Sequence, residues 1–361
     1  MKIVHVELGR HLYGGQRQVA YLMDALPGLG GEHVLVCAEG SDIAGLSGCV
    51  PAKILPLAFG GDVDLGFVAR LRRELRAEQP DLLHIHSRRG DTLATLAGSL
   101  AKIPMVYSRR VDNPPNWLDR RYKFPRYAQV ITISEGIRQV LLGVGLPADQ
   151  VICAPSAVDT AVYREERARA VLEQEFGIGP DVPVIGMVAQ LIPRKGHDVL
   201  LKALPAILEV QPDCQVLIFG KGPLEAELRQ RIEQSRLARS ARLVGFRSDM
   251  PRWLPNLDLV VHPAYMEGLG VALLEAAACG VPMVGTRAGG IPGIVRDGLN
   301  GRLIDAGDSR GLADAVIDLL GDPDRLRAWG QAGRELVEGS FSIGAMARNN
   351  LAVYEAVLSR G

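Results

Sequence analysis

The sequence predicts an α/β protein made of two Rossmann-like domains with doubly wound parallel sheets that face each other across a cleft. Short β-branched runs alternate with longer helical patterns along the whole chain, as is typical of parallel strands joined by crossover helices. The chain of 361 residues is also longer than one hydrophobic core usually supports. A stretch with two prolines, a charged segment at 164–175 that we expect to be helical, and the break Gly177–Pro180 separates two sets of runs. We therefore expect a linker at 154–182.

Each domain has its own set of expected strands. Those of the first are Ile3–Glu7, Val34–Ala38, Leu82–His86, Met105–Ser108 and Val130–Ile133. Those of the second are Val184–Val188, Gln215–Phe219, Arg242–Val244, Leu259–His262 and Met283–Gly285. The stretch 341–361 has the apolar spacing of a docking helix, which we expect to pack back on the N-terminal domain. We therefore assign 1–165 with 341–361 to the first domain and 166–340 to the second.

The composition bounds the partners and the location of the protein. Lys plus Arg and Asp plus Glu both total 41, so no net charge draws the chain to nucleic acid. The five cysteines are scattered without the close pairing of metal or redox motifs, which indicates a reducing compartment. There is no uncharged run of about 18 apolar residues and no signal-peptide pattern at the N-terminus. We expect a cytoplasmic protein, and peripheral contact with the inner face of the membrane stays open.

The segment 262–275 carries the clearest chemistry, because a strand there leads into a glycine loop and then a helix. Gly268 and Gly270 have no Cβ, so their backbone can approach a ligand closely. The helix that follows points free N–H groups and a positive dipole end at the same place, where a diphosphate would fit. Glu267, near the carboxyl end of the strand, is expected to face the cleft, and Glu275 lies where it could accept hydrogen bonds from a ribose. A solvated pair of glutamates beside an ordinary turn is the alternative.

Two histidines mark the first domain. His84 and His86 are two apart on one expected strand and therefore share a face of the sheet. His86 is nearer the carboxyl end of the strand, where ligands bind in open α/β sheets. We expect His86 to reach the cleft and His84 to lie in the core.

Several short motifs follow one another in a specific order. They are Tyr13-Gly14-Gly15, His84-Ile85-His86, Ile133-Ser134, Lys195-Gly196, Phe219-Gly220-Lys221-Gly222-Pro223, Gly245-Phe246, the segment from Glu267 to Glu275, and Ala288-Gly289-Gly290-Ile291-Pro292. In this order, and over nearly the whole chain, the sequence resembles the family 4 glycosyltransferases, which are retaining enzymes with the two-domain GT-B fold.

This resemblance implies a role for each site residue. Glu267 would contact hydroxyls of the transferred sugar, Lys195 would neutralise the donor phosphates as the leaving group gains charge, and His86 would lie near the sugar. The implied donor-binding residues are Gly14, Gly15, Gln190, Arg194, Gly245, Phe246, Gly268, Leu269, Gly270, Val271 and Glu275. Gln190 stands where the family most often has arginine, so we expect its neighbour Arg194 to substitute. Gly14 and Gly15 are expected in the loop after the first strand, where the resemblance implies a flexible loop that approaches the donor phosphates. A solvated lysine, a plain glycine turn and a packed histidine are the alternatives.

Basic residues gather in the N-terminal half of the chain, and aromatic residues are interleaved with the later ones. The basic residues are Arg88, Arg89, Arg109, Arg110, Arg120, Arg121, Lys123 and Arg126, and the aromatic residues are Trp117, Tyr122, Phe124 and Tyr127. Such a mixture suits a phosphorylated acceptor or an anionic membrane surface, although solvated helix faces explain it nearly as well. Arg109 and Arg110 end a strand and are the candidates for binding the acceptor.

Taken together, the resemblance implies retaining transfer of a hexose-type sugar from a nucleotide diphosphate sugar to an acceptor hydroxyl, in cell-envelope glycan or lipopolysaccharide synthesis. We favour a UDP-sugar over a GDP-sugar as the co-substrate and expect no further cofactor. The expected partners are this donor and a glycan or glycolipid acceptor bound by the first domain. We expect no metal, because neither Asp62-Val63-Asp64 nor Asp322-Pro323-Asp324 ends an expected strand.

Three other functions compete with this one. A nucleotide-sugar epimerase of related fold is the alternative enzyme. A non-catalytic nucleotide-sugar-binding subunit would be expected to lack Glu267, Glu275 or Lys195, and all three are present. A nicotinamide dehydrogenase is disfavoured, because no Gly-x-Gly-x-x-Gly follows an expected strand and opens a helix.

Overall fold

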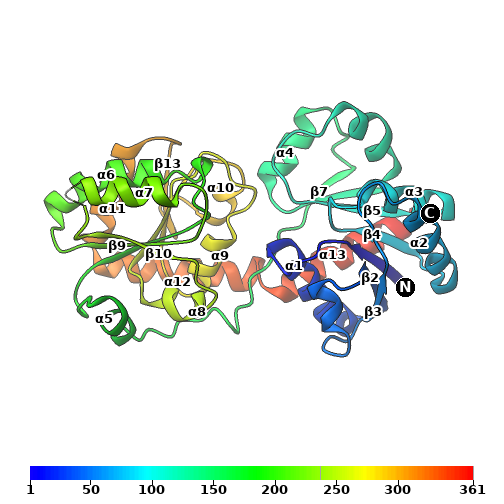
Figure 1. Cartoon of the computed structure of the whole chain (residues 1–361), viewed down its shortest axis with the longest axis horizontal. Coiled ribbons are helices and arrows are strands. Elements are labelled where there is room, and N and C mark those ends of the chain that lie inside the picture. Colours follow the sequence, from blue (N-terminus) through cyan, green and yellow to red (C-terminus); the bar gives the residue numbers. More distant parts are fainter. Residues whose placement is uncertain (236, 361) are drawn as a thin grey trace. The chain divides into compact units, whose positions relative to one another are not determined.

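The computed structural model describes residues 1–235 and 237–360, which divide into two units (Figure 1). The N-terminal unit comprises Met1–Ala157 and the segment from Ile343 onwards, and the C-terminal unit comprises Val158–Ser342. The chain thus leaves the N-terminal unit inside the expected linker and returns to it just before the last helix. The predicted α/β class with two doubly wound parallel sheets is confirmed.

The N-terminal unit is built on a parallel sheet of seven strands in the order β3-β2-β1-β4-β5-β6-β7. The strands are β1 (Lys2–Glu7), β2 (Glu32–Ala38), β3 (Lys53–Leu57), β4 (Leu82–Ile85), β5 (Met105–Arg109), β6 (Gln129–Thr132) and β7 (Val151–Cys153). Its longer helices are α1 (Gly14–Ala25), α2 (Leu65–Glu78), α3 (Asp91–Ala101), α4 (Glu135–Gly143) and α13 (Ile343–Leu358). Strand order reverses between β1 and β4, so their carboxyl ends form the switch point at which such sheets bind ligands.

Successive side chains of β1 point to opposite faces of the sheet, and each face has its own hydrophobic cluster. Val4 and Val6 belong to a cluster that packs against α2 and α3, whereas Ile3 belongs to a cluster that packs against α1 and α13 (Figure 1). Tyr354 of α13 is fully buried in the second cluster. The expected docking of the C-terminal helix on the N-terminal domain is therefore confirmed.

The C-terminal unit has a parallel sheet of six strands in the order β10-β9-β8-β11-β12-β13. These are β8 (Val184–Val188), β9 (Gln215–Phe219), β10 (Ala241–Gly245), β11 (Leu259–His262), β12 (Met283–Thr286) and β13 (Gly301–Ile304). The helices are α5 (Ala170–Phe176), α6 (His197–Val210), α7 (Glu225–Gln234), α8 (Met250–Trp253), α9 (Val271–Ala278), α10 (Ile291–Ile294), α11 (Ser309–Leu320) and α12 (Pro323–Ser340). Here the switch point lies between β8 and β11.

Short 3-10 and π turns complete the described parts of both units. They are η1 (Leu26–Leu29), η2 (Asp42–Leu46), η3 (Asp119–Lys123), η4 (Phe124–Arg126), η5 (Pro193–Lys195) and η6 (Leu254–Asn256). Across residues 1–235 and 237–360, no helix has the length and apolar character needed to cross a membrane.

The strands that the sequence analysis did not predict, β3, β7 and β13, all lie at sheet edges. An edge strand is covered less completely than a central one and therefore lacks a continuous apolar run. In β3 a proline interrupts the run at Pro56, which only an edge strand tolerates, and in β7 Ile152 is exposed. The charged stretch 164–175 was expected to be helical, but helix α5 begins only at Ala170.

Candidate functional site

The carboxyl ends of β1 and β4 open into a pocket of about 420 Å³ in the N-terminal unit. Glu7 ends β1 and His86 follows β4, and both line this pocket together with Gly15, Ser87 and Arg110. The site therefore forms at the switch point of the sheet, as the topology requires.

Glu7 is a pocket residue that the sequence analysis treated only as the end of a strand. Its carboxyl group is buried and accepts hydrogen bonds from the backbone N–H of Gly9 at 2.8 Å and from the Gln16 amide at 3.3 Å. Burial raises the pKa of Glu7, and these bonds together with the charge of Arg110 only partly counter that effect. The signal that could have revealed it was a charged residue at the carboxyl end of the first strand.

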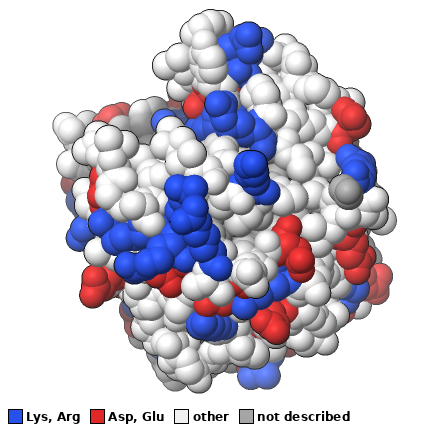
Figure 2. All heavy atoms as spheres, turned by 90° about the vertical axis from the view of Figure 1, so that its right-hand side faces the viewer, with Lys and Arg blue, Asp and Glu red and all other residues white. Residues whose placement is uncertain are grey.

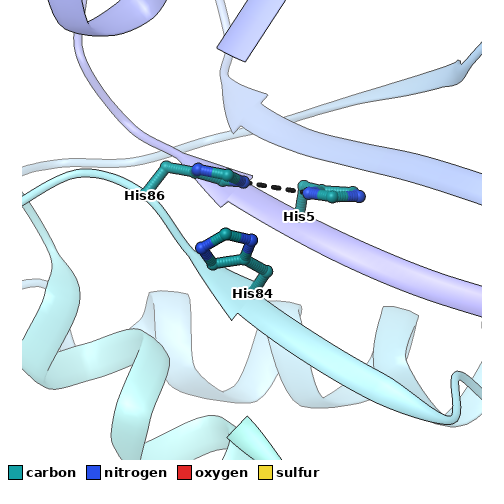
Figure 3. Close-up of side chains that lie close together, drawn as sticks. All are labelled: His5, His84 and His86. Atoms are coloured by element: carbon teal, nitrogen blue, oxygen red, sulfur yellow. Dashed lines mark hydrogen bonds between the residues drawn. The ribbon is translucent and has the colours of Figure 1, made fainter. Parts of the chain in front are cut away.

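His86 lines this pocket, and its ring is almost completely buried. Figure 3 shows it beside His5 and His84, with a hydrogen bond of 2.9 Å between Nε2 of His86 and Nδ1 of His5. His84 lies in the core, where Tyr354 and Ser108 bond its two ring nitrogens at 2.7 and 2.9 Å.

The two candidate acceptor-binding arginines lie in different surroundings. The guanidinium of Arg109 donates to the backbone carbonyls of Val111 and Asn113, at 3.2 and 2.5 Å, and thus braces its own loop. Arg110 lines the pocket, where it donates to the hydroxyl of Ser156 at 3.1 Å and faces Glu7. The structure therefore brings Arg110 to the pocket residues, whereas Arg109 has a bracing role.

Gly14 and Gly15 are not in the loop after the first strand, where the sequence analysis placed them, because helix α1 begins at Gly14. Tyr13 precedes them in extended conformation as the N-cap residue, and it provides no side-chain cap. The first N–H groups of a helix have no partner within the helix. Gly15, which lines the pocket, thus belongs to a helix N-terminus of the kind that binds anions.

In the C-terminal unit, the carboxylate of Glu267 is the centre of a charged cluster. Its Oε2 atom accepts hydrogen bonds from the ammonium group of Lys195 and, at 2.7 Å, from Nε2 of His262. Lys195 and His262 are buried, and Glu267 is largely so. Burial alone would raise the pKa of Glu267, but the contacts with His262 and Lys195 outweigh it and lower that pKa to about 2. Glu267 is therefore ionised at neutral pH.

The loop from β11 to α9, which contains Glu267, is held in place by contacts with the glycine motif 288–292. Gly270 has a φ of +99° and forms the N-cap of α9, a conformation that favours glycine. A Cβ on Gly289 would lie 1.8 Å from the backbone oxygen of Glu267, and the N–H of Gly290 donates to that oxygen at 3.0 Å. The motif 288–292 thus positions Glu267 by backbone contact.

The remaining expected donor-binding residues are spread over several loops and one helix. Gln190 and Arg194 follow β8 and are exposed, and the backbone oxygen of Arg194 accepts from the N–H of Tyr265 at 2.9 Å. Gly245 ends β10, and Phe246 after it is exposed with the ammonium of Lys221 5.0 Å from its ring centre. In the loop before α9, Leu269 is buried, and Gly268 and Val271 lie on either side of Leu269-Gly270. Glu275 is partly buried on α9 itself.

The sequence analysis assigned no role to His262 or His197, although both adjoin the cluster. Neither ring nitrogen of His197 has a hydrogen-bond partner among the residues described, and the pKa of His197 is lowered to about 4, chiefly by burial and then by His262. His197 lines a pocket of about 490 Å³ with Arg194, Asp198 and Tyr265. A histidine at the end of a strand, and another directly after Lys195-Gly196, were the available signals.

Aspartates of the two Asp-x-Asp tripeptides accept hydrogen bonds from backbone N–H groups at the starts of helices. Asp64 caps α2 by accepting from the N–H of Phe67, and Asp322 caps α12 by accepting from the N–H of Arg325. Asp62 accepts from the N–H of Gly90 at 2.7 Å, at the start of α3.

Comparison with known families gives a match for each half of the chain. Residues 13–162 match the model of Glycosyltransferase Family 4, and residues 169–336 match that of the Glycosyl transferases group 1. The chain is 38% identical over 192 residues to the GDP-mannose-dependent alpha-(1-6)-phosphatidylinositol monomannoside mannosyltransferase of Mycolicibacterium smegmatis. That match covers 50% of this chain and 50% of the relative, so the chain spans about half the length of the curated relatives it matches.

Solved structures are similar over the whole chain. A glycosyltransferase from Rickettsia africae matches with a TM-score of 0.88 at 19% identity, covering 100% of this chain and 99% of that one. HepE of Anabaena, in complex with UDP and glucose, matches with a TM-score of 0.79 at 20% identity, covering 98% and 99% of the two chains. At such identities the likeness concerns the fold, and it agrees with the predicted pair of Rossmann-like domains.

Proposed function

This chain belongs to the family 4 glycosyltransferases, with a group 1 domain in its C-terminal half, and we propose that it transfers a hexose-type sugar from a nucleotide diphosphate sugar to an acceptor hydroxyl. The observation that carries this proposal is the contact of Lys195 and His262 with one oxygen of Glu267 in the loop between β11 and α9. The cluster combines a carboxylate, which can accept hydrogen bonds from sugar hydroxyls, with an ammonium group, which can bind the diphosphate of the donor.

Each group of the cluster has a distinct task in the proposed reaction. The ionised Glu267 accepts hydrogen bonds from sugar hydroxyls through Oε1, because Lys195 and His262 occupy Oε2. Lys195 stabilises the diphosphate, which gains charge as the glycosidic bond breaks. Glu275 accepts hydrogen bonds from the nucleotide ribose, and the N-terminus of α9 adds its dipole.

We also propose that the enzyme is metal-independent and retains the anomeric configuration. Lys195 and the helix N-termini supply positive charge for the diphosphate, while the Asp-x-Asp carboxylates are engaged at helix ends. Unchanged turnover in EDTA and a product with the donor's anomeric configuration by NMR are the expected results. Loss of activity in EDTA, or an inverted product, would contradict these two points separately.

The donor is a UDP or GDP sugar. The solved HepE structure contains UDP and glucose, and the relative from Mycolicibacterium smegmatis is named as GDP-mannose-dependent. A thermal-shift panel of UDP, GDP and ADP sugars would identify the nucleotide, with a rise in melting temperature for the correct donor. Incubation with that donor alone separates transfer from epimerisation, because only an epimerase would convert the bound sugar without an acceptor.

For the acceptor we propose a glycolipid of the cell envelope, reached by peripheral contact with the membrane. The segment 116–126 exposes the apolar side chains of Trp117, Leu118 and Tyr122. Arg120, Arg121 and Arg126 of the same segment are also exposed, and Figure 2 shows Lys and Arg gathered in patches on one face with acidic residues between them. Aromatic side chains beside cations suit the interface of an anionic membrane.

The decisive experiment is a transfer assay with the donor found by the panel. An extract of envelope lipids serves as the acceptor, and Glu267→Gln is the inactive reference. We expect labelled sugar to appear in the lipid fraction with the wild type only. Binding of every nucleotide sugar without transfer to any acceptor would favour the non-catalytic subunit instead.

A further inference from the structure

Three histidines form a hydrogen-bonded row across neighbouring strands of the N-terminal sheet. His33 on β2, His5 on β1 and His86 after β4 are all buried. Nδ1 of His33 lies 3.1 Å from Nε2 of His5, and Nδ1 of His5 lies 2.9 Å from Nε2 of His86. Figure 3 shows the second of these contacts with the two rings nearly in line. We call His33, His5 and His86 the histidine row.

The end of the row at β2 fixes the direction of its hydrogen bonds. Nε2 of His33 lies 3.4 Å from the backbone oxygen of Gly30, which can only accept, so this nitrogen carries the hydrogen. The histidines are neutral, because burial lowers the pKa of His5 and His86 far below the usual value and lowers that of His33 as well. A neutral imidazole carries one hydrogen only, and this leaves Nδ1 of His33 as an acceptor.

The same reasoning applies next to His5 and then to His86. His5 must donate from Nε2 to His33, so its Nδ1 accepts, and His86 must donate from Nε2 to His5. The hydrogen of His86 is therefore on Nε2, and Nδ1 carries a lone pair. In the opposite direction two lone pairs would oppose each other at Gly30, and His86 would hold a buried N–H without an acceptor, which is costly.

Nδ1 of His86 has no hydrogen-bond partner in the described part of the chain, and neither does Nε of Arg110. Both side chains line the same pocket, beside Glu7. One buried atom thus lacks a donor and the other lacks an acceptor. A hydroxyl group offers both functions, because it can donate one hydrogen and accept another.

We propose that the histidine row holds His86 in the Nε2–H tautomer, so that its Nδ1 accepts a hydrogen bond from a hydroxyl of the ligand in this pocket. His33 and His5 are then positioning residues that act through His86. The identity of the ligand as a sugar rests on the proposed function, whereas the tautomer does not.

His84 is outside the row, although His5, His84 and His86 each present a nitrogen within 4.8 Å of the others, close enough for a metal ion. Tyr354 and Ser108 already bond both ring nitrogens of His84, and His33 and His86 bond both nitrogens of His5. A shared metal would have to break these bonds. The hydrogen-bonded row therefore explains the arrangement without displacing any partner.

Nitrogen NMR of protein labelled with 15N-histidine distinguishes ring nitrogens that carry a hydrogen from those that do not. In the wild type without ligand we expect a protonated Nε2 and a bare Nδ1 on His86, assigned by the loss of both signals in His86→Asn. A protonated Nδ1 would overturn the proposal. Because the free protein is measured, a failure to bind any nucleotide sugar would count against the proposed function and not against the row.

Variants of His33 test whether the row acts as a unit. His33→Leu cannot bond His5, so we expect the two nitrogens of His86 to move towards averaged shifts. In His33→Gln the amide can donate to Gly30 and accept from His5, and the wild-type pattern should return. A single unchanged tautomer of His86 in folded His33→Leu would overturn the proposal.

Two controls complete the experiment. Tyr354→Phe removes a hydrogen bond from His84 only, so the His86 signals should stay as in the wild type, and averaging of those signals would contradict the row. Addition of Zn²⁺ should leave the spectrum unchanged, whereas stoichiometric binding that shifts His5, His84 and His86 together would replace the row by a metal site.

Discussion

At the scale of single residues, one oxygen of Glu267 has two partners within the protein. Its Oε2 atom accepts hydrogen bonds from both Lys195 and His262. The two contacts keep the carboxylate ionised in a place that would otherwise favour its neutral form. One oxygen thus fixes the charge and the orientation of the carboxylate, and the proposed function assigns recognition of the sugar to the other.

His262 should therefore control the pH range in which Glu267 is ionised. In His262→Leu one charge-assisted hydrogen bond of about 1.5–3 kcal/mol is lost, so the pKa of Glu267 should rise from about 2 by roughly one to two units. The proposed reaction needs the ionised form. As the pH is lowered, the variant should therefore lose activity at a higher pH than the wild type does. A pH profile of kcat/KM measures this shift. His262→Gln keeps a donor and is the control, and an unshifted acid limb would contradict the role of His262.

Glu275 should contribute to donor affinity. Glu275→Ala removes a carboxylate that accepts from the ribose, which should weaken binding by about 1.5–3 kcal/mol, or roughly 10-fold to 150-fold. Calorimetric titration with the donor measures the change. Glu335→Ala on α12 replaces a charge of the same sign outside the candidate site and should bind as the wild type does. Equal affinity of the two variants would remove Glu275 from the site.

The residues of the two sites could be predicted to different extents. Lys195 and Glu267 were found because each belongs to a short local motif, and they are in contact in the structure. His5 and His33 could not be found, because their contact depends on the register of β1 against β2 and β4, which local sequence does not determine. His262 lay inside a motif, but its bond to Glu267 depends on how the loop turns back on the strand.

At the scale of elements, helix α1 begins with two glycines, which are poor helix formers. A Cβ on Gly15 would meet only Arg110, at an ordinary 3.7 Å, so packing does not require glycine there. In the proposed function, this glycine favours close approach of the donor to the start of the helix, at the expense of helix stability.

Gly15→Ala should therefore separate stability from function. We expect the free energy of unfolding of the N-terminal unit to rise by up to about 1 kcal/mol, and donor affinity to fall because a methyl group now covers the first N–H groups. Denaturant titration and calorimetry measure the two effects. Gly143→Ala at the end of α4 has open space around its Cβ and should change stability without changing affinity. A gain in stability with unchanged affinity would make Gly15 an ordinary helix residue.

The segment 116–126, with η3 and η4, should contribute to membrane contact. Arg120→Ala together with Arg121→Ala should weaken binding to anionic vesicles by about 1 kcal/mol for each arginine, or roughly 30-fold for both. Cosedimentation with vesicles of anionic and neutral lipid measures this difference. Arg327→Ala in the C-terminal unit is the matched control, since Arg327 is exposed and pairs with Asp324. Equal binding of the double variant and the wild type would leave the segment as a solvated surface.

The central strands were the easiest elements to predict, and β8, β9 and β11 have the expected bounds. Each lies between two other strands and is covered on both faces, which produces an unbroken apolar run. The edge strands β3, β7 and β13 and the start of α1 depend instead on contacts outside their own sequence, and these elements were missed or misplaced.

At the scale of the whole molecule, the two units differ in their buried histidines. His5, His33, His84 and His86 in the N-terminal unit all have lowered pKa values, whereas in the C-terminal unit His197 has the one lowered histidine pKa found among the residues described. A histidine that is neutral in the folded state and charged in the unfolded state destabilises the fold as the pH falls below the usual value of 6.5.

Acid should therefore open the N-terminal unit first. Each such histidine lowers the free energy of unfolding by up to about 1.4 kcal/mol for every pH unit below its unfolded pKa. Glu7, whose pKa is raised in the folded state, offsets part of this effect. Hydrogen exchange read by mass spectrometry, corrected for intrinsic rates, should show peptides of the N-terminal unit losing protection at a higher pH. Loss of protection in the C-terminal unit at a higher pH than in the N-terminal unit would contradict this order.

Helix α13 has a consequence for the order in which the protein takes shape during translation. When the ribosome has completed residue 157, the nascent N-terminal unit still lacks the helix whose Met346 and Tyr354 complete its second core cluster, and a whole second unit must be made before α13 appears. Val158–Ser342 is continuous in sequence and is ready to fold earlier. The half of the chain that is made first is thus finished last, and its uncovered apolar face is where a chaperone would bind in the meantime.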